Sequence, residues 1–193
     1  MKILFATANK GKLREAAELL GPDFELVCPA DLGITEDIPE TGSTLQENSL
    51  QKAQYLYDRT GIPCFADDSG LEVDALGGAP GIYSARYAGP DHDAQKNMDK
   101  LLAELAGEDR RRARFRTVVT LIPADGRPRF FEGVCEGRIA REKHGAGGFG
   151  YDPVFVADAY PDRSFAEVGE AEKNAVSHRG QAVRAMVSWL KKG

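Results

Sequence analysis

Two adjacent carboxylates are the first residues of this sequence that can do chemistry. Asp67 and Asp68 follow the apolar run Pro63–Ala66 and precede Ser69, so we expect them at the end of a short strand. Neighbouring strand residues point to opposite faces, so the two carboxylates converge only if the strand ends there. They can then hold a hard cation such as Mg²⁺, with one binding metal and the other polarising water. The alternative is an Asp-Ser-Gly turn stabilised by its own side chains.

Three further residues can serve the same site. Glu40 and Glu47 lie in or just after an acidic loop and can complete a set of oxygen ligands, whereas no histidine is placed for a transition metal. Lys52 stands four residues after Asn48 and shares its face of a predicted helix, from which its ammonium group can reach a phosphate beside the acids. A solvated surface lysine is the alternative.

A polar turn near the N-terminus is a candidate polyphosphate site. It provides backbone N–H groups at a helix start, a hydroxyl, an amide and two ammonium groups. Its residues are Thr7, Ala8, Asn9, Lys10, Gly11 and Lys12. The spacing is not that of a Walker A loop. The alternative is that Asn9 only caps the helix and that both lysines are solvated.

The last candidates lie in the C-terminal third of the chain. A glycine-rich loop carries two aromatic rings on which a base can stack, and donors gather around the start of the last predicted helix. These residues are Phe149, Gly150, Tyr151, Asp152, Lys173, His178 and Arg179. The alternatives are that the rings belong to a satellite core and that the histidine is a surface or capping residue.

The predicted elements place the acids and the polar turn at strand ends. We expect strands at 2–6, 24–27, 63–66, 71–73, 115–123, 129–140 and 154–156, and helices at about 13–20, 44–59, 94–105 and 177–190. Ser43 or Thr44 caps the second helix, and Ser177 caps the last one. The turn formers Asp125 and Gly126 predict that the strands on either side are antiparallel.

Composition excludes several classes of protein. The chain has 193 residues, of which 42% are hydrophobic and 28% charged, as expected for one globular domain spanning 1–193. A net charge of −5 argues against general nucleic-acid binding, although the arginine run 110–116 is either a solvated surface or an anion site. Without a secretory signal or an apolar stretch of about 20 residues, we expect no membrane contact and a cytoplasmic protein.

Taken together, these residues resemble the inosine triphosphatase family of house-cleaning pyrophosphatases for XTP, ITP and dITP. Six blocks in the same order carry the resemblance over nearly the whole chain. They are T-A-N-K-G-K at 7–12, E-T-G-S-T-x-x-E-N-S at 40–49, A-D-D-S-G-L at 66–71, L-G-G-A-P-G-I-Y-S-A-R-Y at 76–87, G-G-F-G-Y-D-P at 147–153 and A-E-K-N-A-V-S-H-R-G at 171–180.

The resemblance implies an α/β fold with a curved mixed sheet flanked by helices, two lobes with a cleft between them, and a homodimer. It implies that water attacks the α-phosphorus of a purine nucleoside triphosphate, giving the monophosphate and pyrophosphate. Glu40 and Asp68 would bind Mg²⁺, and Asp68 would accept the proton of the attacking water. Residues 7–12 would hold the triphosphate.

The resemblance also implies the rest of the substrate site. Ser69, residues 149–152, Lys173, His178 and Arg179 would hold the substrate, with Phe149 against the purine and the His-Arg pair at its edge. Asp67, Glu47 and Lys52 are helpers without an assigned role. Ala8 departs from the glycine or serine of many members, which matters little if its φ is negative. Two alternatives stay open: an aspartate-dependent phosphatase and a non-catalytic nucleotide-binding module.

Overall fold

The protein consists of two compact units, each with its own hydrophobic core. The computed structural model describes all 193 residues. The first unit comprises Met1–Asp68, Thr117–Gly133 and Arg179–Gly193, and the second comprises Ser69–Arg116 and Val134–His178. Because three long strands contribute residues to both units, the chain passes between them several times. That the two units act as a single pyrophosphatase domain stays a prediction.

The strands form one mixed sheet. Its order is β2 (Glu25–Val27), β1 (Lys2–Phe5), β3 (Cys64–Val73), β5 (Arg112–Ile122), β6 (Arg129–Ile139) and β7 (Phe155–Ala157), with β4 (Pro80–Gly81) paired to β3. β1 is parallel to β2 and β3, whereas β4 and β7 are antiparallel to their partners. Residues 123–128 are too short a link for a parallel crossover, so β5 and β6 are antiparallel, as predicted. The expected α/β fold with a mixed sheet is confirmed.

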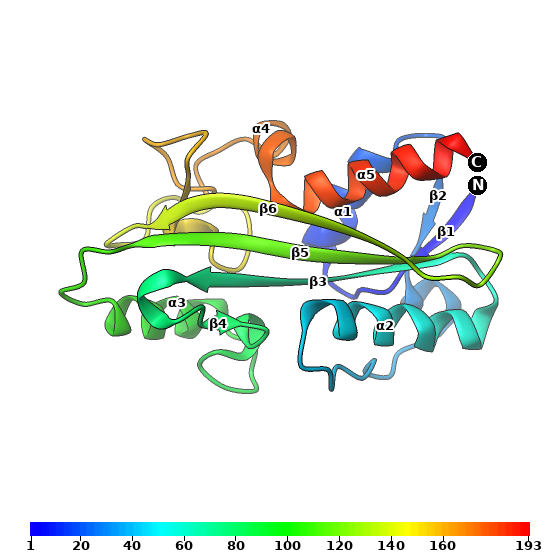
Figure 1. Cartoon of the computed structure of the whole chain (residues 1–193), viewed down its shortest axis with the longest axis horizontal. Coiled ribbons are helices and arrows are strands. Elements are labelled where there is room, and N and C mark those ends of the chain that lie inside the picture. Colours follow the sequence, from blue (N-terminus) through cyan, green and yellow to red (C-terminus); the bar gives the residue numbers. More distant parts are fainter. The chain divides into compact units, whose positions relative to one another are not determined.

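In the first unit, helices cover both faces of the strands. Figure 1 shows α1 (Lys10–Leu20) and α5 (His178–Lys192) on one side of β1 and α2 (Leu45–Thr60) on the other. Strand alternation explains this arrangement. Ile3 and Phe65 pack with the apolar residues of α1 and α5, whereas Leu4, Cys64 and Ala66 pack with those of α2.

The same alternation separates the two acids. β3 does not end at Ala66 but runs unbroken to Val73, because its pairing continues with β4 and β5. The predicted strand end at the acids is therefore wrong. Asp67 shares the face of Phe65, toward α1 and α5, and Asp68 shares the face of Ala66, toward α2. The two carboxylates point apart.

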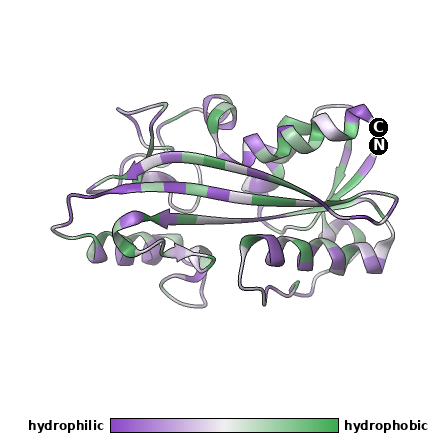
Figure 2. Ribbon diagram, viewed as in Figure 1, coloured by the Kyte–Doolittle hydropathy of each residue, from purple (hydrophilic) through white to green (hydrophobic).

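The second unit packs around one aromatic-rich core. Leu71, Phe115, Phe155 and Phe165 lie in it, together with Met98 of α3 (Ala94–Glu104). In Figure 2, β5 and β6 are banded with hydrophilic and hydrophobic residues, as expected for strands with unlike faces. Short helices complete the chain: α4 (Glu170–Val176) and the 3₁₀ turns Pro29–Leu32, Asp74–Leu76, Ser84–Arg86 and Asp152–Val154. The sequence pattern did not predict α4, which has only seven residues.

The arginine run on β5 is matched by acids. The ion pairs are Arg112 with Asp158 and Glu136, Arg114 with Asp74, Glu72 and Glu136, and Arg116 with Glu72. Such cross-strand pairs fit a solvated sheet face better than an anion site. No helix of the protein is long and apolar enough to cross a membrane.

Candidate active site

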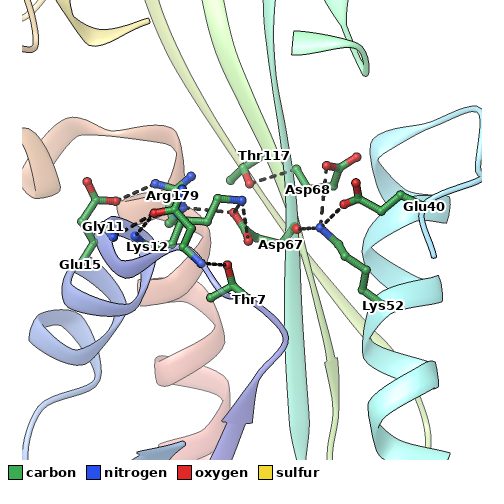
Figure 3. Close-up of polar contacts among 11 residues, drawn as sticks. Thr7, Gly11, Lys12, Glu15, Glu40, Lys52, Asp67, Asp68, Thr117 and Arg179 are labelled. Carbon is green, nitrogen blue, oxygen red and sulfur yellow. Dashed lines mark hydrogen bonds and ion pairs between the residues drawn. The ribbon is translucent and has the colours of Figure 1, made fainter. Parts of the chain in front are cut away.

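Asp67 lies at the centre of a buried ion-pair cluster in the first unit. Its carboxylate, in a residue only 1% exposed, accepts hydrogen bonds from Lys12 Nζ and from Arg179 Nε, each at 3.1 Å. Arg179 Nη1 also donates to Glu15 Oε2 at 2.6 Å (Figure 3). Burial alone would raise the pKa of Asp67, but the charges of Lys12 and Arg179 hold it well below its usual range. Asp67 is therefore a permanent anion that, together with Glu15, balances the charges of Lys12 and Arg179.

The charge of Lys12 depends on this cluster. Burial lowers the pKa of the Lys12 ammonium group, and the nearby Arg179 lowers it further, whereas Asp67 opposes both effects. Lys12 would lose its proton more readily without Asp67. The cluster thus keeps a cation at the start of α1.

Asp68 meets a different group on the opposite face of β3. Lys52 Nζ lies 2.6 Å from Glu40 Oε1, 2.5 Å from the carbonyl oxygen of Asp67 and 3.9 Å from Asp68 Oδ1. Asp68 Oδ2 is buried and has no hydrogen-bond partner. Burial raises the pKa of Asp68 to about 6, and Glu40 adds to this rise while Lys52 opposes it. The charge of Asp67 is thus balanced by cations, whereas Asp68 changes its protonation state near neutral pH.

The donors around Asp68 fit a hard divalent cation. Two carboxylates share one ammonium group, which leaves surplus negative charge when both are ionised, and Asp68 Oδ2 is an acceptor without a donor. No group of three or more His, Cys, Asp or Glu side chains is arranged to hold a metal ion. Mg²⁺ suits such a site because it is commonly held by one or two carboxylates and completes its shell with water and substrate phosphates.

Glu47 has a different place from the one expected for a metal ligand. Its carboxylate accepts the N–H of Ser43 at 2.7 Å and the Ser43 hydroxyl at 2.9 Å. Thr44, the N-cap residue of α2, accepts the Glu47 N–H at 3.1 Å. Of the two predicted caps, Thr44 is confirmed, and Ser43 instead binds the Glu47 carboxylate.

The polar turn presents side-chain donors. Asn9 Oδ1 caps α1 by accepting the N–H groups of Gly11 at 2.9 Å and Lys12 at 3.2 Å, and Thr7 Oγ1 accepts the Asn9 N–H at 3.1 Å. The Thr7 hydroxyl proton and the Asn9 amide nitrogen are left to donate elsewhere. Ala8 is not among the residues with positive φ, so alanine fits there without strain.

In the second unit, Asp152 organises the aromatic loop. The buried Asp152 carboxylate accepts the Phe149 N–H at 3.0 Å and a hydrogen bond from Lys173 Nζ at 2.6 Å. The Lys173 ammonium group also lies 4.4 Å from the centre of the Phe149 ring. Lys173 thus fixes the loop from within, and Phe149 itself is half-buried. Tyr151 donates to the carbonyl oxygen of Ser84 at 2.6 Å and belongs to the core, as the satellite-core alternative expects.

The remaining predicted residues are divided between the units. Ser69 is half-buried on β3 of the second unit. His178 is the last residue of that unit, and its ring stacks on Phe115 at 4.7 Å. Arg179, the next residue, belongs to the first unit and is 3% exposed between Glu15 and Asp67. That these residues hold one substrate stays a prediction.

Sequence reasoning missed two residues of the first unit. Glu15 pairs with a guanidinium group 164 positions away, and no local pattern signals this contact. Thr117 Oγ1 donates to the carbonyl oxygen of Asp68 at 3.1 Å, so a buried hydroxyl fixes the backbone immediately after the second acid. A threonine facing inward on a predicted strand was the only available signal.

The fold and these contacts define an α/β protein in which one strand presents a neutralised acid on one face and an acid paired with lysine on the other. The chain belongs to the Ham1 family, whose model matches residues 3–189.

Relatives and a solved structure agree with this assignment. A protein of Porphyromonas gingivalis is 50% identical over 190 residues, covering 98% of this chain and 97% of its own, and is named dITP/XTP pyrophosphatase. One of Christiangramia forsetii with the same name is 47% identical over 192 residues and covers both chains fully. The Ham1 protein of Staphylococcus aureus superimposes with a TM-score of 0.89 at 37% identity, covering 100% of this chain and 99% of its own. The resemblance drawn from the six blocks is confirmed.

Proposed function

We propose that this protein hydrolyses non-standard purine nucleoside triphosphates, namely dITP, XTP and ITP, to the nucleoside monophosphate and pyrophosphate. Full-length relatives at 47% and 50% identity bear the name dITP/XTP pyrophosphatase. The observation in this chain that carries the proposal is the contrast between its two adjacent acids. Asp67 is held ionised by Lys12 and Arg179, whereas Asp68 has a raised pKa and an oxygen without a hydrogen-bond partner. A phosphoanhydride is cleaved by charge neutralisation and an aligned water, and no covalent nucleophile is required.

Asp68 is the proposed proton acceptor. Its unpartnered Oδ2 and a pKa of about 6 suit a general base near neutral pH. As the oxygen of water bonds to the α-phosphorus, the bond from that phosphorus to the bridging oxygen breaks and pyrophosphate leaves. Asp68 takes the proton released by the water. Lys52 keeps Asp68 partly ionised, since its charge opposes the effect of burial.

The proposed cofactor is Mg²⁺, held by Glu40 and Asp68. When bound, it would supply positive charge to the phosphate oxygens. The surplus negative charge around Lys52 and the unpartnered Asp68 Oδ2 support this choice. Ligands from the substrate would complete the shell, so we expect tighter metal binding with nucleotide than without it.

The triphosphate would be bound by residues 7–12 through side chains. The Thr7 hydroxyl and the Asn9 amide have donors to offer, whereas the N–H groups of Gly11 and Lys12 are already bound to Asn9. Lys12 would add positive charge that Asp67 maintains. Lys10, which is exposed, is the other ammonium group of this turn.

The purine would be bound by the second unit, with Phe149 stacking on the base and Ser69, Gly150 and His178 as further contacts. The Lys173 ammonium group lies 4.4 Å from the centre of the Phe149 ring and draws electron density toward itself, which favours stacking of a purine on the ring. A site that donates to the 6-oxo group of hypoxanthine or xanthine meets a donor amino group in adenine, so buried donors would be left unpaired with ATP.

Phosphorus NMR in H₂¹⁸O tests the reaction. We expect dITP, XTP and ITP to give monophosphate and pyrophosphate, with ¹⁸O only in the monophosphate and with slow turnover of ATP and GTP. Orthophosphate with a nucleoside diphosphate would refute the reaction, and so would ¹⁸O in the pyrophosphate. Asp68→Asn should fold and lose most turnover, while Gln54→Leu on the outer face of α2 is the matched control.

Two further proposals concern the state of the protein. We infer from the family resemblance that it is a homodimer, which light scattering coupled to size exclusion would test. We also infer that it acts in the cytoplasm, where the nucleotide pool is found. Fractionation of the source cells would contradict this if the protein were recovered outside the cytoplasm.

A further inference from the structure

The loop that carries Glu40 is attached to α2 through its backbone. Three consecutive backbone N–H groups each donate to a different side chain of that helix. They are Thr41 N–H to Gln51 Oε1 at 2.8 Å, Gly42 N–H to Asn48 Oδ1 at 2.7 Å and Ser43 N–H to Glu47 Oε2 at 2.7 Å. The loop is therefore fixed to the helix immediately after Glu40, which limits where the Glu40 carboxylate can lie.

Asn48 is the buried member of these three acceptors. It is 3% exposed, whereas Gln51 is half-buried and Glu47 is exposed. A buried amide is costly unless it is hydrogen-bonded, so breaking the bond between Asn48 and Gly42 costs more free energy than breaking either of the other two. The approach is also close: a Cβ at Gly42 would lie 2.8 Å from Asn48 Oδ1 and 2.6 Å from Glu47 Cβ. Only glycine allows this contact.

The loop position that Asn48 fixes decides where the Glu40 carboxylate lies relative to the second acid. Lys52, one helical turn after Asn48 on α2, has its Nζ atom 2.6 Å from Glu40 Oε1 and 3.9 Å from Asp68 Oδ1. An ammonium group attracts both carboxylates without the fixed directions of a planar amide, so the bond between Asn48 and the loop backbone defines the position of Glu40 more closely.

We propose that Asn48 is a positioning residue that, through the backbone of Gly42, fixes the Glu40 carboxylate beside Asp68 and with it sets the affinity for a divalent cation. This inference rests on the proposed function, because it takes these two acids as the metal ligands. Neither the family model nor the names of the relatives assign a role to Asn48. Its action is through other groups, since it would contact neither metal nor substrate.

Two measurements on the full-length protein test the proposal. Mn²⁺ binding is followed by electron paramagnetic resonance, and the exchange rate of the Gly42 amide by NMR. We expect Asn48→Leu to accelerate Gly42 exchange and to weaken Mn²⁺ binding about 10- to 100-fold, the usual effect of losing a group that orients a ligand. Gly42→Ala, which pushes the loop away without altering Asn48, should weaken Mn²⁺ binding similarly. Gln54→Leu, which removes only an exposed contact with Asp58, should change neither quantity.

The outcomes separate this inference from the proposed metal site. Glu40→Gln is the reference variant, because it removes a proposed ligand directly. If Glu40→Gln weakens Mn²⁺ binding while Asn48→Leu and Gly42→Ala bind it like the wild type, the positioning role is refuted and the metal site stands. If the wild type binds no Mn²⁺, or Glu40→Gln binds it equally well, the metal site is refuted and the inference falls with it.

Discussion

Replacing each of the two adjacent acids by asparagine should change stability in opposite directions. Asp67→Asn leaves the buried Lys12 and Arg179 without their shared anion, and Glu15 is then the only carboxylate of the cluster. Removing one partner of a buried ion pair costs about 3–5 kcal/mol. Because asparagine keeps one acceptor oxygen, the lower end of this range is expected.

Asp68→Asn should instead stabilise the metal-free protein. The pKa of Asp68 is raised from 3.8 to about 6. A rise of about two pKa units lowers the free energy of unfolding by about 3 kcal/mol when the folded protein holds the ionised form. A raised acid pKa means that this loss is absent below pH 4, grows between pH 4 and 6 and is constant above. The stability that Asp68→Asn gains over the wild type should depend on pH in the same way. The stability that Asp67→Asn loses should be constant from pH 5 to 8, because the pKa of Asp67 is lowered and its carboxylate is ionised throughout.

Urea titrations at pH 4.5 and pH 8 in the presence of a chelator provide the assay. Trp189 is the only tryptophan and lies in the first unit on α5, the helix that also carries Arg179, so its fluorescence reports unfolding of that unit. At pH 8 we expect Asp67→Asn to unfold at lower urea than the wild type, and Asp68→Asn at higher urea. If the urea midpoints of the two variants shifted equally, or if Asp67→Asn unfolded at the same urea concentration as the wild type, the assignment of separate roles to the two acids would be refuted.

Four other predictions follow from the contacts. The Asp68 carboxyl should titrate near pH 6 by carbon NMR in the metal-free protein, and its pKa should fall when Mg²⁺ is added; an unchanged pKa would argue against metal binding there. Lys52→Met removes the charge that opposes the rise of this pKa, so the acid limb of the kcat/KM profile should move to higher pH; an unmoved limb would exclude Asp68 as the base. Glu15→Gln should lower the free energy of unfolding by about 1.5–3 kcal/mol, measured by urea titration, because a charged hydrogen bond is lost. Gly148→Ala places a Cβ 2.1 Å from Asp152 Oδ2 at a φ of +67°, so KM should rise while Mn²⁺ affinity stays the same.

The sequence by itself determined the local features of the site. The helix cap at Asn9 and the cap at Thr44 with Glu47 depend on residues only two or three positions apart. Contacts over such short spans can be predicted from residue type and spacing. Asn48 and Lys52 share a face of α2 because they are four residues apart. Six ordered blocks were enough to predict the family, and with it the candidate acids.

Only the tertiary structure decided what the two acids do. The unbroken course of β3 puts Asp67 and Asp68 on opposite faces, and the pairing that keeps the strand extended comes from segments distant in sequence. Asp67 is neutralised by residues 55 and 112 positions away, while at Asp68 the effects of burial and Glu40 outweigh the opposing charge of Lys52. The sequence shows that both side chains are carboxylic acids. Their ionisation depends on burial and on charges within a few ångströms, and those are set by which distant segments the fold brings to each face.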